Sequence, residues 1–335
     1  MGGKLPRALA SPYGGGVERA KQARRKGSFR IPNSEFRIIF FSSAHTGTVI
    51  LTNTIDLHIH TTASDGTLSP AQVVRTAHEL GLEAIAITDH DTVSGFGEAA
   101  AEGAELGLEV VPGLELSSRY GRIIHILGYY VRTESPILGR VLESIVGERD
   151  ERNRKIAALM AADGLAADYG EMKRRFGPVI GRPHFGQLLV EQGQAESVPQ
   201  AFARWLDKGQ RYYLPRKMPS IERAVECIRE AGGVPVLAHP YQYGLEEPAL
   251  RQLIEHCMDH GLLGLECRYS SYSEEQSQAL LSLAREYGLA PSGGSDFHGD
   301  SKPNIAIGSG EGSLAVPAAW LPPLRNLAIS TKKRR

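Results

Sequence analysis

Cysteine is scarce in this sequence, and long apolar runs are absent from it. Cys227, Cys257 and Cys267 form an odd set without C-x-x-C spacing, which argues against a disulfide framework and a thiolate zinc site and favours a reducing compartment. No run of 18 apolar residues could cross a bilayer. The apolar run at residues 38–41 is too short for a convincing signal peptide. We therefore expect a cytoplasmic protein that does not contact membranes.

The chain also lacks net charge, because its two oppositely charged parts cancel. Residues 1–50 carry nine Lys and Arg against Glu18 and Glu35, a balance of +7, so the remaining residues sum to −7. An acidic body offers no general surface for nucleic acid, so any recognition of phosphate has to be local. The sequence gives no sign of an obligate protein partner.

Residues 1–48 differ from the rest of the chain. They are rich in Gly, Pro, Ser and Arg and show no sustained hydrophobic periodicity. We predict an unstructured basic tail, or an over-extended gene start. Nucleic-acid binding by this tail is the less favoured alternative.

From Thr54 onward, short apolar runs alternate with amphipathic segments. The predicted strands are 55–60, 84–88, 109–113, 123–130, 234–238, 262–267 and 289–293. This rhythm predicts an α/β fold with parallel strands wound into a sheet or barrel. It is interrupted by a long charged helix at 136–163 and shorter helices at 183–193 and 198–207. We therefore expect a barrel formed by 51–133 and 219–312, a helical insertion subdomain at 134–218, and a C-terminal tail at 313–335.

Histidines and carboxylates occupy the ends of the predicted strands. His58 and His60 lie two apart on one strand, so they project to the same side and suit a divalent metal, with Asp65 close enough in sequence to hold a second ion. Similar side chains mark the later strands: His90, Glu115, His125, His239, Asp296 and His298. Each has an ordinary alternative role, such as a helix cap or a turn. Together they favour a metal site, because converging buried charges are costly without a cation.

The order D-x-H-x-H, S-D-G, T-D-H-D, G-x-E, H-x-L-G-Y, A-H-P and S-D-x-H, across residues 55–310, resembles the PHP (polymerase and histidinol phosphatase) family. The resemblance implies a distorted seven-stranded (β/α) barrel with two or three divalent metal ions at the C-terminal mouth. It implies three ligand groups: His58, His60, Glu115 and Asp296; then Glu115, His125 and His239; then Asp65, His90 and His298. Asp89 is expected to support catalysis by orienting an imidazole or a bound water.

Within the predicted insertion, residues 148–156, 181–184 and 206–209 resemble the TrpH-like branch of this family. Its members include nucleoside 3′,5′-bisphosphate and AMP phosphatases and a 5′→3′ exoribonuclease acting on short RNA. The implied substrate-binding residues are Arg149, Arg152, Asn153, Lys155, Arg182, His184 and Lys208. Guanidinium groups three residues apart on a helix suit phosphate oxygens. The alternative is a solvated face on which neighbouring acidic residues pair with the arginines.

The sequence thus predicts a metal-dependent phosphoesterase that hydrolyses nucleotides or short oligoribonucleotides through metal-activated water, with His184 as a candidate proton donor. Mixed His and carboxylate ligands favour Mn²⁺, and Zn²⁺ or Fe²⁺ also fit. Histidinol phosphate phosphatase is the rival activity, but those enzymes lack this insertion pattern. A non-catalytic accessory module is less favoured because none of the nine ligands is missing.

Overall fold

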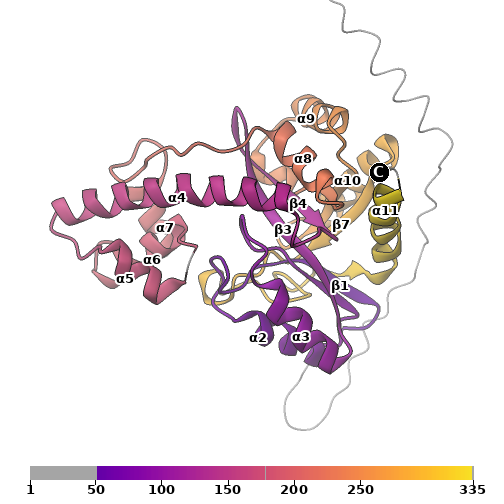
Figure 1. The fold of residues 1–335 in the computed structure, drawn as a ribbon, viewed down its shortest axis with the longest axis horizontal. Coiled ribbons are helices and arrows are strands. Elements are labelled where there is room, and N and C mark those ends of the chain that lie inside the picture. Colours follow the sequence, from indigo (N-terminus) through magenta and orange to yellow (C-terminus); the bar gives the residue numbers. More distant parts are fainter. Residues whose placement is uncertain (1–50, 178, 334–335) are drawn as a thin grey trace, which may run out of the picture.

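The computed structural model describes residues 51–177 and 179–333, so the expectation for residues 1–48 lies outside the described part. One sheet of eight strands has the order β7-β6-β5-β4-β3-β2-β1-β8 (Figure 1). The strands are β1 (Thr54–Ile59), β2 (Ala84–Ile87), β3 (Glu109–Tyr120), β4 (Arg122–Tyr129), β5 (Val234–Leu237), β6 (Gly264–Tyr269), β7 (Ala290–Gly294) and β8 (Val316–Pro317).

The sheet curves until β7 meets β1, which makes a nearly closed barrel. The backbone N–H of Asp296 donates to the carbonyl of His58 at 2.7 Å, and the N–H of His60 donates to the carbonyl of Phe297 at 3.0 Å. Gly294 permits this approach, since a Cβ there would lie 2.3 Å from the backbone nitrogen of His58. The predicted α/β barrel is therefore confirmed.

The prediction that all strands run parallel is wrong at β4. Strands β1, β2 and β3 are parallel, as are β5, β6 and β7, but β4 is antiparallel to both β3 and β5. Gly121 alone separates β3 from β4 and has a φ of +65°. Such a connection permits only a hairpin, because a parallel pair needs a crossover of a dozen or more residues.

Two further boundaries differ from the sequence prediction. Strand β3, expected to end near 113, continues to Tyr120 because it pairs with β4 along its whole second half. The segment 313–335, expected to be a tail, contains β8, which pairs antiparallel with the start of β1, and α11 (Leu321–Lys333). The fully buried Val316 explains why this short run belongs to the fold. The sheet accordingly has eight strands rather than seven.

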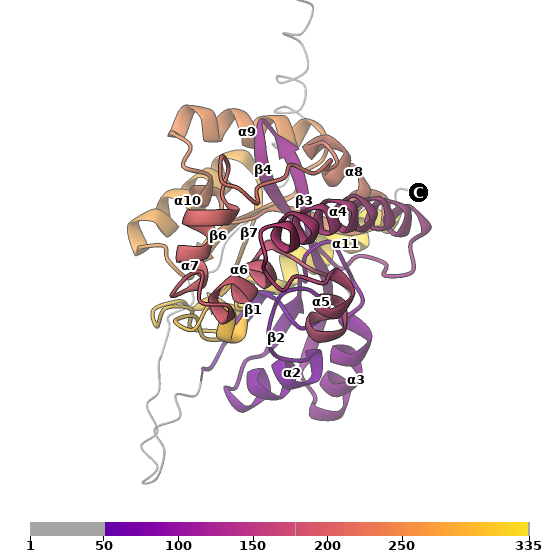
Figure 2. The same cartoon turned by 90° about the vertical axis from the view of Figure 1, so that its left-hand side faces the viewer.

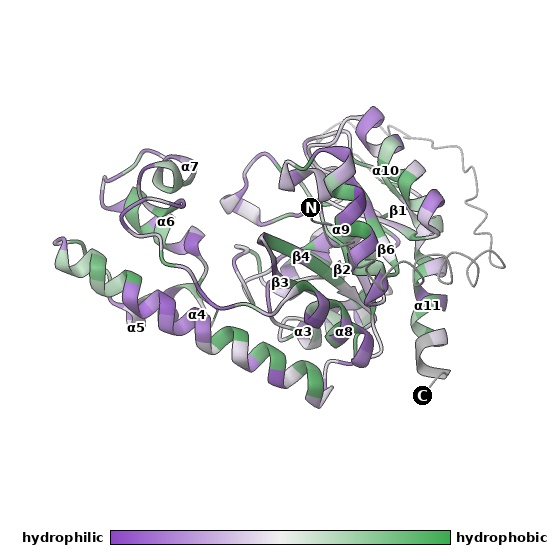
Figure 3. Ribbon diagram, turned by 90° about the horizontal axis from the view of Figure 1, so that it is seen from above, coloured by the Kyte–Doolittle hydropathy of each residue, from purple (hydrophilic) through white to green (hydrophobic). Residues whose placement is uncertain are grey.

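Helices surround the barrel, and α2, α8 and α10 each begin after a capping serine. They include α2 (Pro70–Glu79), α3 (Phe96–Leu106), α8 (Ile221–Glu230), α9 (Glu247–Asp259) and α10 (Glu274–Tyr287), with short 3-10 turns at Pro240–Tyr243, Gly299–Ser301 and Ala318–Trp320. Ser69 and Gln72 form a capping box before α2, and Ser273 and Gln276 form another before α10. Figure 3 shows mixed hydropathy on these helices and strongly hydrophobic stretches in the strands they cover. No helix in the described part of the chain is both long and apolar enough to cross a membrane.

A group of helices occupies the chain between β4 and α8. It comprises α4 (Pro136–Ala162), α5 (Tyr169–Phe176), α6 (Arg182–Glu191), α7 (Val198–Ala201) and a π-helix, η1 (Phe202–Leu206). Helix α4 starts beside the barrel, where Leu138 and Ile145 join the main core. Its far half packs Ile156 and Met160 into a second core with α5 and α6 (Figures 1 and 2). That this group acts as a separate subdomain remains a prediction.

Candidate metal centre

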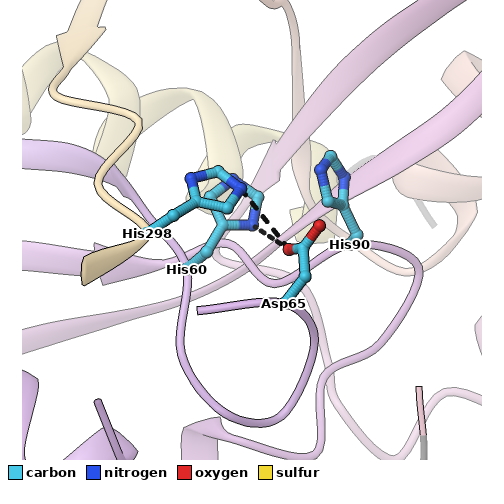
Figure 4. Close-up of side chains that lie close together, drawn as sticks. All are labelled: His60, Asp65, His90 and His298. Atoms are coloured by element: carbon cyan, nitrogen blue, oxygen red, sulfur yellow. Dashed lines mark ion pairs between the residues drawn. The ribbon is translucent and has the colours of Figure 1, made fainter. Parts of the chain in front are cut away.

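The strand ends bring all nine predicted ligands into one buried cluster at the barrel mouth. Three overlapping groups have ligand atoms within 4.8 Å of one another: His58, His60 and Asp296; His60, Asp65, His90 and His298; and His90, Glu115 and His125. His239 joins through its Nε2 atom, 3.3 Å from Nδ1 of His125. Figure 4 shows the second group, in which Asp65 lies close to His60 and His298. The sequence separations are large, so only the closed barrel assembles this set.

Glu115 lies at the centre of the cluster, on β3. Its Oε1 atom is 3.0 Å from Nδ1 of His125 and 2.9 Å from Nε2 of His239. Its Oε2 atom faces three further imidazoles at 2.9–3.5 Å, those of His90, His60 and His58. Burial raises the pKa of Glu115, but the charges of His125 and His90 outweigh burial and hold that pKa well below its usual range. An ionised carboxylate between two sets of imidazoles has the geometry of a bridging ligand.

Asp296 provides a second carboxylate at the point where the barrel closes. Its Oδ1 atom is 3.2 Å from Nε2 of His60 and 3.5 Å from Nε2 of His58. The Oδ2 atom accepts hydrogen bonds from Tyr269 Oη at 2.7 Å and Lys302 Nζ at 2.6 Å. Burial opposes ionisation, yet Lys302 and His58 hold the pKa of Asp296 well below its usual range. One oxygen is therefore fixed by protein donors while the other is directed at the histidines.

Asp65 organises the outer side of the cluster. Its Oδ1 atom lies 3.4 Å from Nε2 of His298 and 3.9 Å from Nδ1 of His60. The carboxylate belongs to the loop after β1, and burial raises its pKa less than His90 and His298 lower it. Asp65 is therefore ionised at neutral pH, as a metal ligand must be.

The buried atoms of this centre fit divalent metal ions. Several ring nitrogens and one carboxylate oxygen are buried and have no hydrogen-bond partner among the described residues: Nε2 of His58, both ring nitrogens of His60, Nδ1 of His90, Nδ1 of His239 and Oδ1 of Asp65. Buried polar atoms without partners are rare and costly. Nitrogen and carboxylate donors in this number match the preferences of borderline divalent cations.

Glu266, which the sequence analysis did not single out, holds two of the histidines in place. Its Oε1 atom is 2.9 Å from Nδ1 of His58, and its Oε2 atom accepts the backbone N–H of His239 at 2.5 Å. A carboxylate on Nδ1 leaves Nε2 of His58 free to bind a metal. The signal in the sequence was a glutamate inside the apolar run 262–267, where a solvent-facing charge would be out of place.

Asp89 contacts a loop rather than the imidazoles it was expected to orient. Its Oδ1 atom accepts from the backbone N–H of Thr61 at 2.7 Å and from Ser64 Oγ at 2.6 Å, and its Oδ2 atom accepts from Thr61 Oγ1 at 2.8 Å. Its expected role in orienting an imidazole or a bound water therefore stays a prediction. Asp89 instead fixes the loop that carries Asp65.

A cluster of arginines adjoins the metal centre around the buried carboxylate of Asp91. Arg149, on α4, forms an ion pair with Asp91, and Arg216 lies 3.2 Å from the same oxygen. Burial lowers the pKa of His90, but the charges of Glu115 and Asp65 outweigh burial and raise that pKa above its usual value; Arg149 is near enough to oppose them in part. Sequence reasoning missed Asp91 and Arg216, although Asp91 follows the ligand His90 directly. The Nη1 atom of Arg216 is buried without a hydrogen-bond partner.

Arg152 and Arg182 extend this cluster, and among the described residues neither forms an ion pair with a carboxylate. Among the described residues, no Asp or Glu lies within 4.0 Å of either guanidinium. Arg182 lies over the rings of Phe202 and Tyr213. Burial and repulsion from Arg216 and Arg182 lower the pKa of Arg152 to about 9. We call Arg149, Arg152, Arg182 and Arg216 the arginine cluster.

The other predicted substrate residues have different surroundings. The buried Asn153 accepts from Arg152 Nε at 2.9 Å and donates to the carbonyl of Ile180 at 2.7 Å, so it positions Arg152. Lys155 is exposed and paired with Glu151 at 2.7 Å, which is the solvated-face alternative for this helix. Lys208 is exposed as well. Neither lysine takes part in the buried arginine cluster.

His184 is buried at the start of α6, beside the outer group of ligands. Its Nδ1 atom accepts the backbone N–H of Gly181 at 3.0 Å, and its ring stacks on Phe176. Burial lowers its pKa, opposed by the charge of Asp65. The neutral ring therefore carries its proton on Nε2, from which it can donate a hydrogen bond.

Comparisons with known proteins agree with this architecture. Residues 56–214 match the family model described as PHP domain. The chain is 36% identical to the 5'-3' exoribonuclease Rnm of Escherichia coli, covering 72% of this chain and 84% of the relative. It is 35% identical to the 3',5'-nucleoside bisphosphate phosphatase of Chromobacterium violaceum, covering 77% and 91%. A crystal structure of a putative metal-dependent phosphoesterase from Bifidobacterium adolescentis superposes with a TM-score of 0.73 at 28% identity, covering 82% of this chain and 96% of that one.

The barrel and its His and carboxylate cluster define a metal-dependent phosphoesterase, a hydrolase of phosphoester bonds. The chain belongs to the PHP domain family.

Proposed function

We propose that this protein hydrolyses nucleotides that carry more than one phosphate, either nucleoside 3′,5′-bisphosphates or the 5′ ends of short RNA. The observation that carries the proposal is the arginine cluster beside the metal centre. Four guanidiniums gather there, of which Arg149 and Arg152 are buried and Arg182 and Arg216 are partly buried, and the ion pairs formed by Arg149 and Arg216 both end on Asp91. Buried cations without enough counter-charge are unfavourable, so this site is suited to an anion. A phosphate held there would lie next to a second one at the metals.

The nine His and carboxylate residues are proposed to bind two or three divalent ions, with Mn²⁺ favoured over Zn²⁺ and Fe²⁺ by the oxygen and nitrogen mixture. When bound, such ions polarise the phosphoryl group and lower the pKa of a water to supply the nucleophile. Glu115 holds the two halves of the centre together, because its two oxygens face different histidines.

The protein's own side chains supply orientation and a proton. The arginine cluster binds the phosphate that is not cleaved, since guanidinium forks match phosphate oxygens. The neutral ring of His184 donates a hydrogen bond from Nε2–H to the departing oxygen, because its Nδ1 already accepts the Gly181 N–H, and water supplies the proton that the alkoxide takes up. Asp89 keeps the loop with Asp65 in place through Thr61 and Ser64.

The helical group between β4 and α8 is proposed to be the substrate-recognition subdomain of the enzyme. It contributes three of the four clustered arginines, Arg149 and Arg152 from α4 and Arg182 from α6. Its own core fixes the far half of α4. We propose that the enzyme works in the cytoplasm, where its nucleotide substrates occur.

A substrate panel with manganese tests the proposal. Wild-type protein is assayed on adenosine 3′,5′-bisphosphate, AMP, short 5′-phosphorylated RNA, histidinol phosphate and a small aryl phosphate. Arg152→Ala is expected to raise KM for the bisphosphate by roughly 10- to 100-fold, from the loss of a charge-assisted contact of about 1.5–3 kcal/mol. The aryl phosphate, which has no second phosphate, should be much less affected.

Lys155→Ala is the matched control, because it removes a cation from the same helix at an exposed position. Its kinetics should resemble those of the wild type. Preference for histidinol phosphate would overturn the proposed substrate class. An equal loss on both substrates in Arg152→Ala would assign that residue to the cleaved phosphate or to folding.

A further inference from the structure

A second group of histidines and carboxylates lies on the helices that cover the barrel, in the pair α8 and α9. Glu222 and Glu226 are four residues apart on α8, and His256 on α9 is four residues before His260, the residue that caps the C-terminus of α9. Residues with this spacing share a helix face. The pairs meet across the two helices: Nε2 of His256 lies 2.5 Å from Glu222 Oε1, and Nδ1 of His260 lies 3.0 Å from Glu226 Oε1.

Three of these side chains converge on one point instead of forming two separate pairs. One ligand atom from each of Glu222, His256 and His260 lies within 4.8 Å of the other two. Ligands of zinc lie about 2.0–2.2 Å from the ion, which places neighbouring donors about 3.5 Å apart in a tetrahedral site. Rotation of the side chains alone can shorten the distances between the donor atoms from within 4.8 Å to about 3.5 Å, because all three side chains are about one-third exposed.

The remaining surroundings suit a cation. Glu226 contacts Nδ1 of His260, which orients that ring and leaves its Nε2 free as a ligand. Glu222 lies in the first turn of α8, where its partly exposed carboxylate faces Nε2 of His256. The ring of Tyr120, at the tip of the β3–β4 hairpin, lies 4.9 Å from the ring of His256 and covers one side.

We propose that Glu222, His256 and His260 bind one divalent cation of the zinc class, which joins α8 to α9 at a site separate from the barrel mouth. Two nitrogen donors and one carboxylate leave a fourth position for water, a donor set that zinc accepts. The site would act as a link between two helices that lie side by side on the barrel. Its role is structural, because no residue of the metal centre or of the arginine cluster belongs to it.

Zinc stoichiometry of the full-length protein tests this proposal. Chelator-treated wild type and His256→Ala/His260→Ala protein are dialysed against the same low concentration of Zn²⁺ alone, and bound zinc is counted by mass spectrometry. The double variant is expected to bind one equivalent fewer and to lose part of the thermal stabilisation that zinc gives the wild type. His78→Ala is the matched control, since His78 is exposed in the last turn of α2 and should leave the zinc content unchanged.

Activity separates this site from the one in the barrel. Manganese-dependent hydrolysis by the double variant should equal that of the wild type, since none of its altered residues lies in the barrel mouth. Equal zinc content in wild type and double variant overturns the proposal, and so does a parallel loss of zinc and activity. If the double variant does not fold, Glu222→Gln keeps the size of the side chain and gives the same test with the same expected loss of one equivalent.

Discussion

Glu266 holds His58 and His239 with its two oxygens, accepting the ring Nδ1–H of the first and the backbone N–H of the second. The carboxylate is fully buried on β6. It therefore couples the first strand of the barrel to the turn after β5, and it sets the direction of two groups that face Glu115.

Glu266→Gln should weaken manganese binding by about 10- to 100-fold, the usual cost of losing a partner that orients a metal-binding histidine. Glutamine keeps the shape, but its amide cannot accept from both His58 and His239. Activity measured against manganese concentration gives the shift, and high manganese should restore most of kcat. A kcat loss that manganese does not restore would show that Glu266 does more than orient ligands.

His58→Ala and Asp296→Ala should each abolish turnover while the protein stays folded. Each change removes a proposed metal ligand from the barrel mouth, whereas the apolar core below it is untouched. The loss should exceed the roughly 100-fold effect of an orienting residue. Steady-state assays and circular dichroism are the measurements. Near-normal turnover of purified His58→Ala would refute the assignment of the centre.

Asp91→Asn should destabilise the protein by about 3–5 kcal/mol, the cost of breaking a buried ion pair by removing one partner. The change leaves Arg149 and Arg216 without their shared counter-charge. Urea unfolding gives the size of the loss. Added inorganic phosphate should restore more stability to this variant than to the wild type, because an anion can replace the missing carboxylate. Equal phosphate effects on both proteins would argue against an anion site there.

The three cysteines should react slowly with a thiol reagent at pH 8 in the native protein. Burial raises the pKa of Cys227 to about 11 and that of Cys257 to about 12, and it also raises the pKa of Cys267. A raised pKa keeps the thiol protonated at this pH, and the thiolate is the reactive form. Denaturation in guanidinium should expose all three to rapid labelling. Fast labelling of the native protein would contradict their burial.

The strand periodicity predicted an α/β fold with a wound sheet or barrel, and the resemblance of the ligand motifs to the PHP family predicted the barrel; both rest on local signals. His58 and His60 are two residues apart, so their shared direction follows from one strand alone. The antiparallel β4 and the inclusion of β8 depend on how distant segments pair, which periodicity does not record. Glu266, Asp91 and Arg216 were missed for the same reason, because each acquires its role only from partners that are remote in the sequence.

Lys155 shows that sequence features can also suggest a site residue that the fold leaves exposed. Its charge and helical position match those of a phosphate-binding residue, yet it projects into solvent beside Glu151. The sequence of a basic helix does not reveal which of its side chains face the metal centre. Arg149 and Arg152, which the family resemblance also named, differ from Lys155 in being buried, and this difference follows from the packing of α4 in the folded protein.

The way α4 is anchored limits where insertions and deletions can occur in this part of the chain. Its first half is anchored in the barrel by Leu138 and Ile145, and its second half is anchored in the other core by Ile156 and Met160. Arg149 and Arg152 lie between these anchors, so the phase of one continuous helix sets their direction. Inserting a single residue before Arg149 would turn everything beyond it by about 100°. Length changes in this helical group are therefore tolerable only at its outer loops, because α4 fixes the distance between the metal centre and the arginine cluster.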